Sequence, residues 1–236
     1  MTPRLLAVRS AVVRRRAIPL VVALAAVVLA LGGGVWLAVS HNTSSGSQSP
    51  GTVAGADLAR RWHVATGSEA GYRVRARFVG RDTPVTVTGR TDRVSGGLLL
   101  TQSRQGLVVS RGAHFEIDMA SLRSGNDERD RRLRTVGLET DRYPTATFVT
   151  SRSITLPPDV LSGRETRILT FGQLTLHGVT RAFALPVDAR LRDDRIEISC
   201  ELALVLGDFR IHPPDLPGFV TVDIHGSMQV HLVLRS

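Results

Sequence analysis

The sequence predicts an all-β domain of antiparallel strands, preceded by one N-terminal transmembrane helix and interrupted by a short helical insertion. Three observations lead to this prediction. β-prone segments recur beyond residue 60, most of them alternate apolar with polar residues, and the first 39 residues contain one long uncharged apolar stretch. Alternation with a period of two is typical of strands with one buried face. Many such strands close into a barrel or pack as a two-sheet sandwich.

The N-terminal region has the pattern of a membrane anchor. Residues 17–39 carry no charge, and a helix of that length covers the roughly 30 Å hydrocarbon core. Residues 1–16 contain five arginines, which places the N-terminus in the cytoplasm and the following domain outside. A cleaved signal peptide is the alternative, but its apolar region is usually about 7–15 residues long. We therefore predict a single-pass protein of the cell membrane.

The rest of the chain divides into a linker and one folded domain. Residues 40–56 are small, polar and uncharged, which is typical of a flexible tether. Residues 57–236 are enough for one barrel or sandwich with a sizeable core. The predicted organisation is a basic cytoplasmic segment over 1–16, an anchor over 17–39, a linker over 40–56 and a β-domain over 57–236.

The composition excludes several classes of function. All 30 basic residues are arginines, so chemistry that requires a lysine amine is excluded. Beyond residue 56, 25 arginines face 21 acids without a dense basic cluster, so we expect no nucleic-acid binding. Cys200 is the only cysteine, so the chain has no internal disulfide. Because Cys200 alternates with Ile198 and Leu202, we expect it to fill the core.

The expected strands follow from the alternation of apolar and polar residues. Tyr72–Phe78 alternates apolar with arginine residues without exception. Gly172–Arg181 reads GQLTLHGVTR and predicts a hairpin with its turn at Gly178, where a positive φ is readily adopted; a bulge is the alternative. Expected strands cover residues 72–78, 85–91, 97–101, 107–109, 113–119, 145–151, 166–177, 179–191, 195–206 and 219–234.

Two segments interrupt the strand pattern. Residues 121–143 are rich in charge and predict one or two helical turns, with Asn126 or Asp127 as the cap and Gly137 at the end. The acids of this segment could suggest catalysis or metal binding, but a solvated helix face paired with the neighbouring arginines is favoured. Pro157-Pro158 predicts a loop.

We find no nucleophile elbow, paired cysteine ligands, glycine-rich phosphate loop or histidine pair at helical spacing. No metal site, no cofactor and no catalytic residue is therefore expected, and the protein is not predicted to be an enzyme. A hydrolase using Asp130, Asp141 or His177 is the weakest alternative, because none of them has a visible nucleophile partner.

The apolar faces of the expected strands supply the candidates for a barrel lining. A barrel of about eight strands encloses either packed side chains or one small ligand, and the pattern alone leaves both open. The candidate lining residues are Tyr72, Val74, Phe78, Phe148, Leu174, Leu176, Phe183, Ile198, Leu202, Leu204, Val222 and Ile224.

Three motifs add a resemblance to a known family. The motifs occur in the order and spacing found in that family. They are Arg129-Asp130-x-x-Leu133, Tyr143-Pro144 followed by Phe148, and the block over 172–181. In these motifs the chain resembles the YceI-like proteins, and the similarity extends more loosely from Trp62 to the last strand. The resemblance implies an extended, lipocalin-like antiparallel barrel whose elongated apolar cavity holds polyisoprenoid or other long-chain amphipathic lipids. It implies no catalytic residues.

The chain departs from the family pattern at two places. Val79-Gly80 stands where the family has a histidine, and Asp208-Phe209-Arg210 stands for the family's Arg-x-x-Phe-Gly. Arg210 could narrow the mouth of a pocket or meet an anionic head group.

The resulting functional hypothesis is a membrane-tethered extracytoplasmic protein that sequesters or carries an isoprenoid-like or acyl lipid in its barrel. The expected partners are this hydrophobic lipid and the membrane, which the protein contacts through its N-terminal helix. The pattern leaves a homodimer open. The alternative is a filled barrel that acts as a protein-interaction module of the cell envelope without a ligand.

Overall fold

A computed structural model of the chain describes residues 58–213 and 218–236. The predicted basic segment, membrane anchor and linker, residues 1–56, lie outside the described residues. Among the residues that are described, no helix is both long and apolar enough to cross a membrane.

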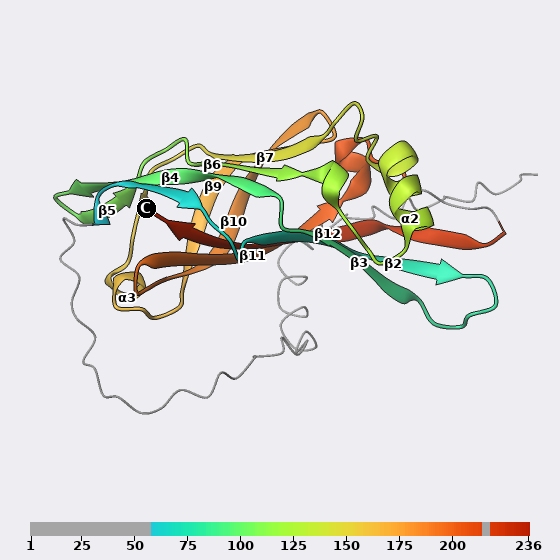
Figure 1. The fold of residues 1–236 in the computed structure, drawn as a ribbon, viewed down its shortest axis with the longest axis horizontal. Helices are drawn as coiled ribbons and strands as arrows, with labels where there is room; N and C mark the ends of the chain where they lie inside the picture. Colours follow the sequence, from blue (N-terminus) through green and yellow to red (C-terminus); the bar gives the residue numbers. More distant parts are fainter. Residues whose placement is uncertain (1–57, 214–217) are drawn as a thin grey trace, which may run out of the picture. The chain divides into compact units, whose positions relative to one another are not determined.

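Eight antiparallel strands form a closed barrel (Figure 1). The strand order is β1-β12-β11-β10-β9-β7-β6-β4, and β4 pairs with β1 again to close the ring. The closure confirms the predicted all-β barrel and removes the sandwich alternative. The barrel strands are β1 (Arg61–Val64), β4 (Val94–Ser103), β6 (His114–Asp118), β7 (Thr145–Thr150), β9 (Thr166–Leu176), β10 (Val179–Arg192), β11 (Arg195–Val205) and β12 (Val220–Arg235).

Four further strands extend this ring at its two ends. β2 (Glu69–Phe78) pairs with the first part of β12, and β3 (Val85–Thr91) pairs with β2. β5 (Gly106–Val109) pairs with β4, and β8 (Ile154–Thr155) pairs with β5. In Figure 1 the β2–β3 hairpin and the start of β12 project together from one end of the barrel.

The short strand β1, which closes the barrel, was missed by the sequence interpretation. It pairs with β12 through His63 and Val64 and with β4 through residues 61–63. Trp62 is fully buried, and its indole N–H donates to the Leu58 carbonyl oxygen at 3.1 Å. A Cβ on Gly97 of β4 would lie 2.2 Å from the Trp62 carbonyl oxygen, so only glycine permits this close approach.

The short helical elements are η1 (Met119–Ser121), α2 (Asp127–Arg132), the π-helix η2 (Leu133–Gly137), α3 (Pro158–Leu161) and η3 (Leu206–Phe209). Asn126 caps α2, because its side-chain oxygen accepts from the Arg129 N–H at 2.9 Å, so the predicted helical insertion is confirmed. The loop predicted at Pro157-Pro158 is wrong, because α3 begins at Pro158. Proline suits a first helical position, where its missing N–H would have no partner.

The hairpin of β9 and β10 turns at His177 and Gly178. Leu176 pairs directly with Val179, so the loop has two residues, with φ of 51° and 70°. Two positive φ angles are typical of the hairpin turn that matches strand twist. The turn interpretation is therefore confirmed and the bulge alternative is wrong.

Candidate functional site

The interior of the closed barrel contains an apolar cavity of about 130 Å³, here called the barrel chamber. Strands β4 to β12 and α3 supply its lining, which is almost entirely aliphatic and aromatic. Cys200 and three threonines are its only lining residues with side-chain hydroxyl or thiol groups. Burial raises the pKa of the Cys200 thiol from 9.0 to about 11, which fits an inert group on the cavity wall.

A second cavity of about 290 Å³, here called the helical chamber, lies between the projecting sheet and the helical insertion. β2, β3, β11 and β12 form one wall, and Met119, Leu122, Leu133 and Leu138 come from the insertion. This lining contains charged side chains, which the lining of the barrel chamber lacks. Its polar members are Tyr72, Asn126, Glu128, Arg129, Arg132 and Ser227.

The two chambers lie end to end along the same strand faces. On β9, Leu174 lines the barrel chamber and Leu176 lines the helical chamber. On β11, Leu202 and Leu204 divide in the same way. Met228 of β12 lines both chambers. Side chains two residues apart on a strand point to the same face, so the two chambers are neighbours along one inner face of the sheet.

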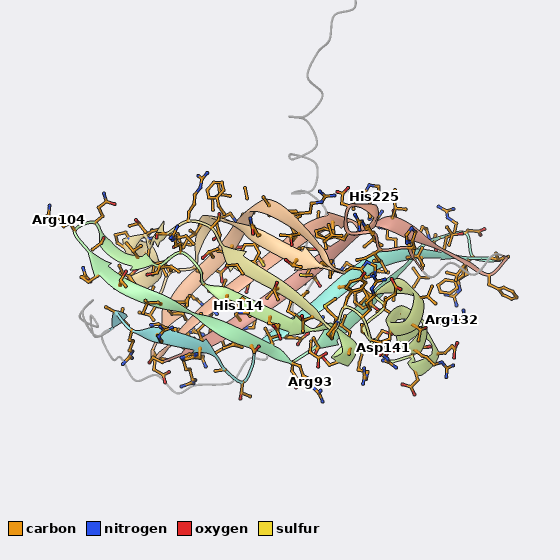
Figure 2. All side chains as sticks on the ribbon, turned by 90° about the horizontal axis from the view of Figure 1, so that it is seen from above. Arg93, Arg104, His114, Arg132, Asp141 and His225 are labelled. Atoms are coloured by element: carbon orange, nitrogen blue, oxygen red, sulfur yellow. The ribbon has the colours of Figure 1, made fainter. Side chains whose placement is uncertain are left out.

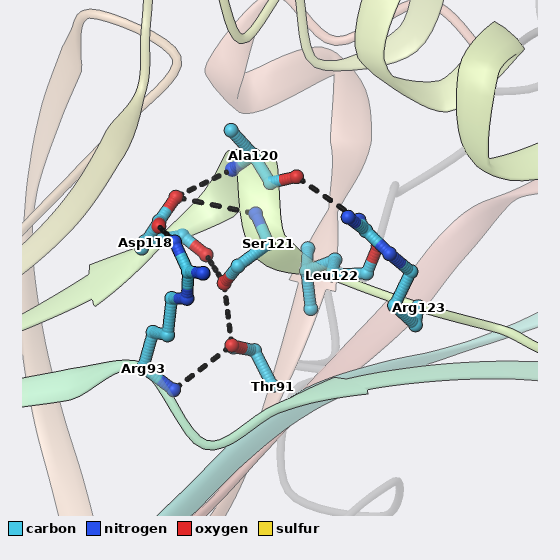
Figure 3. Close-up of polar contacts among 7 residues, drawn as sticks. All are labelled: Thr91, Arg93, Asp118, Ala120, Ser121, Leu122 and Arg123. Carbon is cyan, nitrogen blue, oxygen red and sulfur yellow. Dashed lines mark hydrogen bonds and ion pairs between the residues drawn. The ribbon is translucent and has the colours of Figure 1, made fainter.

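A network of hydrogen bonds holds η1 against the sheet (Figure 3). The Asp118 side chain accepts from the N–H groups of Ala120 and Ser121 at 2.9 and 3.2 Å. The Ser121 hydroxyl lies 2.5 Å from that of Thr91 at the end of β3. Because Met119 and Leu122 flank these contacts and line the helical chamber, the network fixes that wall.

A buried acid anchors the loop before α2. Asp130 is only 2% exposed, and its carboxylate accepts from the Ser124 N–H at 3.1 Å and from the Ser124 hydroxyl. The Arg129 guanidinium donates to the same hydroxyl at 2.7 Å and to the Ser124 carbonyl oxygen at 2.8 Å. The expectation of a solvated acid is therefore wrong for Asp130, because the loop folds back over it.

This buried network reaches the chamber wall at Tyr72. Burial raises the pKa of the Tyr72 hydroxyl above its usual 10.0, while a hydrogen bond with Ser124 and the charge of Arg129 act in the opposite direction. Tyr72 therefore joins the lining of the helical chamber to the network around Ser124. On the exposed side of α2, Glu128 pairs with Arg131 and Arg132, as expected for a solvated face.

Comparison with known proteins identifies the fold family. The family model of the YceI-like domain matches residues 63–234, which is most of the chain. The chain belongs to the YceI-like family. No relative with a curated description matches it.

Among solved structures, one with a TM-score above 0.5 shows the same fold at low identity, and two others are similar to this chain at lower TM-scores. A polyisoprenoid binding domain from Saccharophagus degradans, implicated in plant cell wall breakdown, is 21% identical, with a TM-score of 0.56 over 74% of this chain and 98% of that chain. BcnA of Burkholderia cenocepacia is 18% identical, with a TM-score of 0.48 over 69% of this chain and 95% of that one. The YceI protein of Campylobacter jejuni is 16% identical, with a TM-score of 0.48 over 66% and 89%.

The structure places the candidate lining residues of this YceI-like barrel as follows. Six of them line the helical chamber: Tyr72, Val74, Phe78, Leu176, Leu204 and Val222. Phe148, Leu174, Ile198 and Leu202 line the barrel chamber. Phe183 lines neither chamber; it is half-buried and its ring stacks on Phe209 at 6.2 Å. Lipid contact by any of these residues remains a prediction.

Ile224 is the clearest misplacement. It is 56% exposed, although alternation with Val222 placed it on the inner face. Val222 pairs with Ala76 of β2 while Gly226 pairs with Val74, so residues 223–225 bulge opposite Arg75. A bulge changes the direction of the side chains within it, which a strict two-residue period does not anticipate.

Arg210 also lies outside the lining of both chambers. It ends η3 with a φ of 57°, in the left-handed region that favours glycine. A positive φ at this position explains why the family pattern has a glycine here. Neither of the two roles considered for Arg210, narrowing the mouth of a pocket or meeting an anionic head group, is shown by its position.

The three residues of the hydrolase alternative do not form one site. His177 is buried, with Nδ1 donating to the Phe209 carbonyl oxygen at 3.0 Å and Nε2 lying 2.9 Å from a Glu139 carboxylate oxygen. Asp141 is exposed (Figure 2), and Asp130 is held by Ser124. Within 58–213 and 218–236 no group of three or more histidine, cysteine or acidic residues could hold a metal ion.

Proposed function

We propose that this YceI-like protein binds a long-chain amphipathic lipid, isoprenoid-like or acyl, along its two neighbouring chambers, and sequesters or carries it. The observation that carries the proposal is the pair of apolar cavities lying end to end, with Met228 in the lining of both. A core filled by its own side chains would leave few voids larger than a water molecule. The proposed place of action is the outer face of the cytoplasmic membrane, with residues 17–39 as the anchor.

The apolar lining suits a hydrocarbon tail. Burial of each methylene group contributes about 0.8 kcal/mol, so a long tail needs few polar contacts. An apolar cavity of about 150 Å³ is known to stay dry and to accept a ring of six carbon atoms. The barrel chamber, at about 130 Å³, is of this size, and the larger helical chamber lies next to it, with Met228 in the lining of both.

The polar groups give the proposed ligand a direction. Arg129, Arg132 and Glu128 line only the helical chamber, together with Tyr72. A polar head group in this chamber would find charged and polar side chains, whereas the barrel chamber offers the aliphatic tail an almost wholly apolar wall. We therefore place the head group beside α2 and the end of the tail in the barrel chamber.

The first experiment asks whether the protein carries a lipid. Full-length protein purified from its own membranes is analysed by native mass spectrometry, and its lipids are extracted and identified. A stoichiometric long-chain lipid supports the proposal. Protein without bound lipid, together with no uptake of a fluorescent isoprenoid or acyl probe, favours the filled-barrel interaction module.

The second experiment fills the site. Leu204 is buried in the lining of the helical chamber, whereas Leu169 of β9 is 54% exposed. We expect Leu204→Trp to weaken binding of the fluorescent probe at least tenfold, because the indole occupies the space of several methylene groups. Leu169→Trp makes the same chemical change on the surface and should bind like the unmodified protein. Equal binding by both variants would place the lipid elsewhere.

A further inference from the structure

The outer face of the projecting end of the barrel differs chemically from the chamber beneath it. On β2, Val74, Ala76 and Phe78 line the helical chamber, and Arg73, Arg75 and Arg77 alternate with them and are exposed. Opposite directions of successive side chains therefore put a row of three guanidinium groups directly behind the chamber wall.

The row of arginines ends in exposed apolar side chains. Val79 continues the same alternation and is 72% exposed, and its N–H donates to the carbonyl oxygen of Phe219 at 2.9 Å. Phe219, just before β12, is 73% exposed. We call Arg73, Arg75, Arg77, Val79 and Phe219 the tip surface. The bulge that exposes Ile224 lies opposite Arg75 and adds a third large apolar side chain to this end.

The arginines of the tip surface form no close ion pair with the described residues. Within residues 58–213 and 218–236, none of the three forms an ion pair, although most other parts of the sheet pair their arginines with acids. Asp223 accepts from the N–H and ring nitrogen of His225, and these hydrogen bonds, together with the weaker effect of the Arg75 charge, lower its pKa. A positive row ending in an exposed aromatic and an exposed aliphatic residue is complementary to an anionic lipid surface, which offers phosphate groups above hydrocarbon.

From this complementarity we propose that the tip surface docks on an anionic membrane, with Val79 and Phe219 entering the acyl boundary and Arg73, Arg75 and Arg77 meeting lipid phosphates. Val220 and Val222, which follow Phe219, line the helical chamber. Docking would therefore bring the wall of that chamber to the bilayer. The proposal concerns the outer surface and does not require a lipid inside the protein.

The test follows a fluorophore at the tip. Val79→Cys is labelled with an environment-sensitive dye in the full-length protein, which is then reconstituted into vesicles of phosphatidylcholine with or without phosphatidylglycerol. Cys200 is the only other thiol; because burial raises its pKa to about 11, it should react with the dye much more slowly than an exposed cysteine at neutral pH. Arg104→Cys, in the exposed β4–β5 turn at the other end of the barrel (Figure 2), is the matched control.

Docking has a defined signature. The dye at position 79 should shift to shorter wavelength and be quenched by brominated acyl chains in anionic vesicles, and the dye at position 104 should not. Changing Arg73, Arg75 and Arg77 together to Gln should lower the docking constant roughly 100-fold. High salt should also lower the docking constant of the protein with its arginines unaltered, because salt screens their attraction to lipid phosphates. This measurement tests the proposal even if the triple variant is unstable.

Two outcomes would overturn the proposal. In the first, positions 79 and 104 respond alike in both kinds of vesicle. In the second, the dye at position 79 responds to protein concentration rather than to anionic lipid, which would make the tip surface an interface between copies of this chain. Neither outcome depends on uptake of a lipid into the chambers.

Discussion

The turn between β9 and β10 allows a sharp test of the fold. Gly178 has a φ of 70°, and a Cβ at this position would lie 2.6 Å from Cε1 of Tyr143, whose ring packs on His177 with 4.4 Å between ring centroids. Gly178→Val therefore combines two costs. The left-handed backbone costs about 1–2 kcal/mol for a residue with a Cβ, and overpacking adds about 1–3 kcal/mol. We expect a loss of about 3 kcal/mol, which lowers the melting temperature by roughly 6–12 °C.

Gly112→Val separates these two costs. Gly112 has a φ of 84°, but a Cβ there would meet no atom within 4 Å. It should therefore lose only the backbone part, about 1–2 kcal/mol. Thermal unfolding of the barrel domain, followed by circular dichroism, measures both variants. An unchanged melting temperature for Gly178→Val would refute the turn, and equal losses in the two variants would refute the packing against Tyr143.

Three further predictions test buried and strained groups. Asp130→Ala leaves the Ser124 N–H without its acceptor, so we expect a loss of about 2–3 kcal/mol in urea unfolding; a change below about 0.5 kcal/mol would contradict the network. Arg210→Gly relieves a φ of 57° and should raise stability by about 1 kcal/mol in the same assay, whereas a loss would mean that the arginine side chain contributes more than its backbone costs. Since burial raises the pKa of Cys200 from 9.0 to about 11, iodoacetamide at pH 8 should alkylate the folded protein roughly 100-fold more slowly than the protein in urea. Equal rates would show an accessible thiolate.

The raised pKa of Cys200 also fixes the sign of a pH effect. Between about pH 9 and 11 the folded thiol keeps its proton while the unfolded thiol loses it, so the unfolded state binds fewer protons. Any contribution of this group to stability is complete below pH 9 and is lost as the pH rises toward 11.

The sequence was sufficient for the strands with regular alternation. Tyr72–Phe78, residues 85–91 and the Gly172–Arg181 hairpin were predicted because each is an amphipathic strand or a turn with local chemistry. The same alternation selected ten residues that line the chambers. It could not give the chamber volumes, because these depend on how side chains from distant strands fill the space between them.

The failures have a common physical origin in tertiary contacts. β1 is only four residues long, and the strands it pairs with, β4 and β12, lie far from it in the sequence. No local sequence pattern therefore predicts it. Ile224 leaves the inner face because of a bulge relative to β2. Asp130 is buried by a loop that folds back on its own helix. In each case the deciding neighbour is known only after the chain has folded.

The position of Met228 makes the proposed lipid site sensitive to oxidation. Its thioether is the one side chain in the lining of both chambers, so a tail that occupies both must pass it. Oxidation to the sulfoxide would replace a soft apolar surface with a polar, chiral group at the junction. Such damage would put a polar group in the way of any tail that extends from one chamber into the other, and a methionine sulfoxide reductase would restore the apolar side chain.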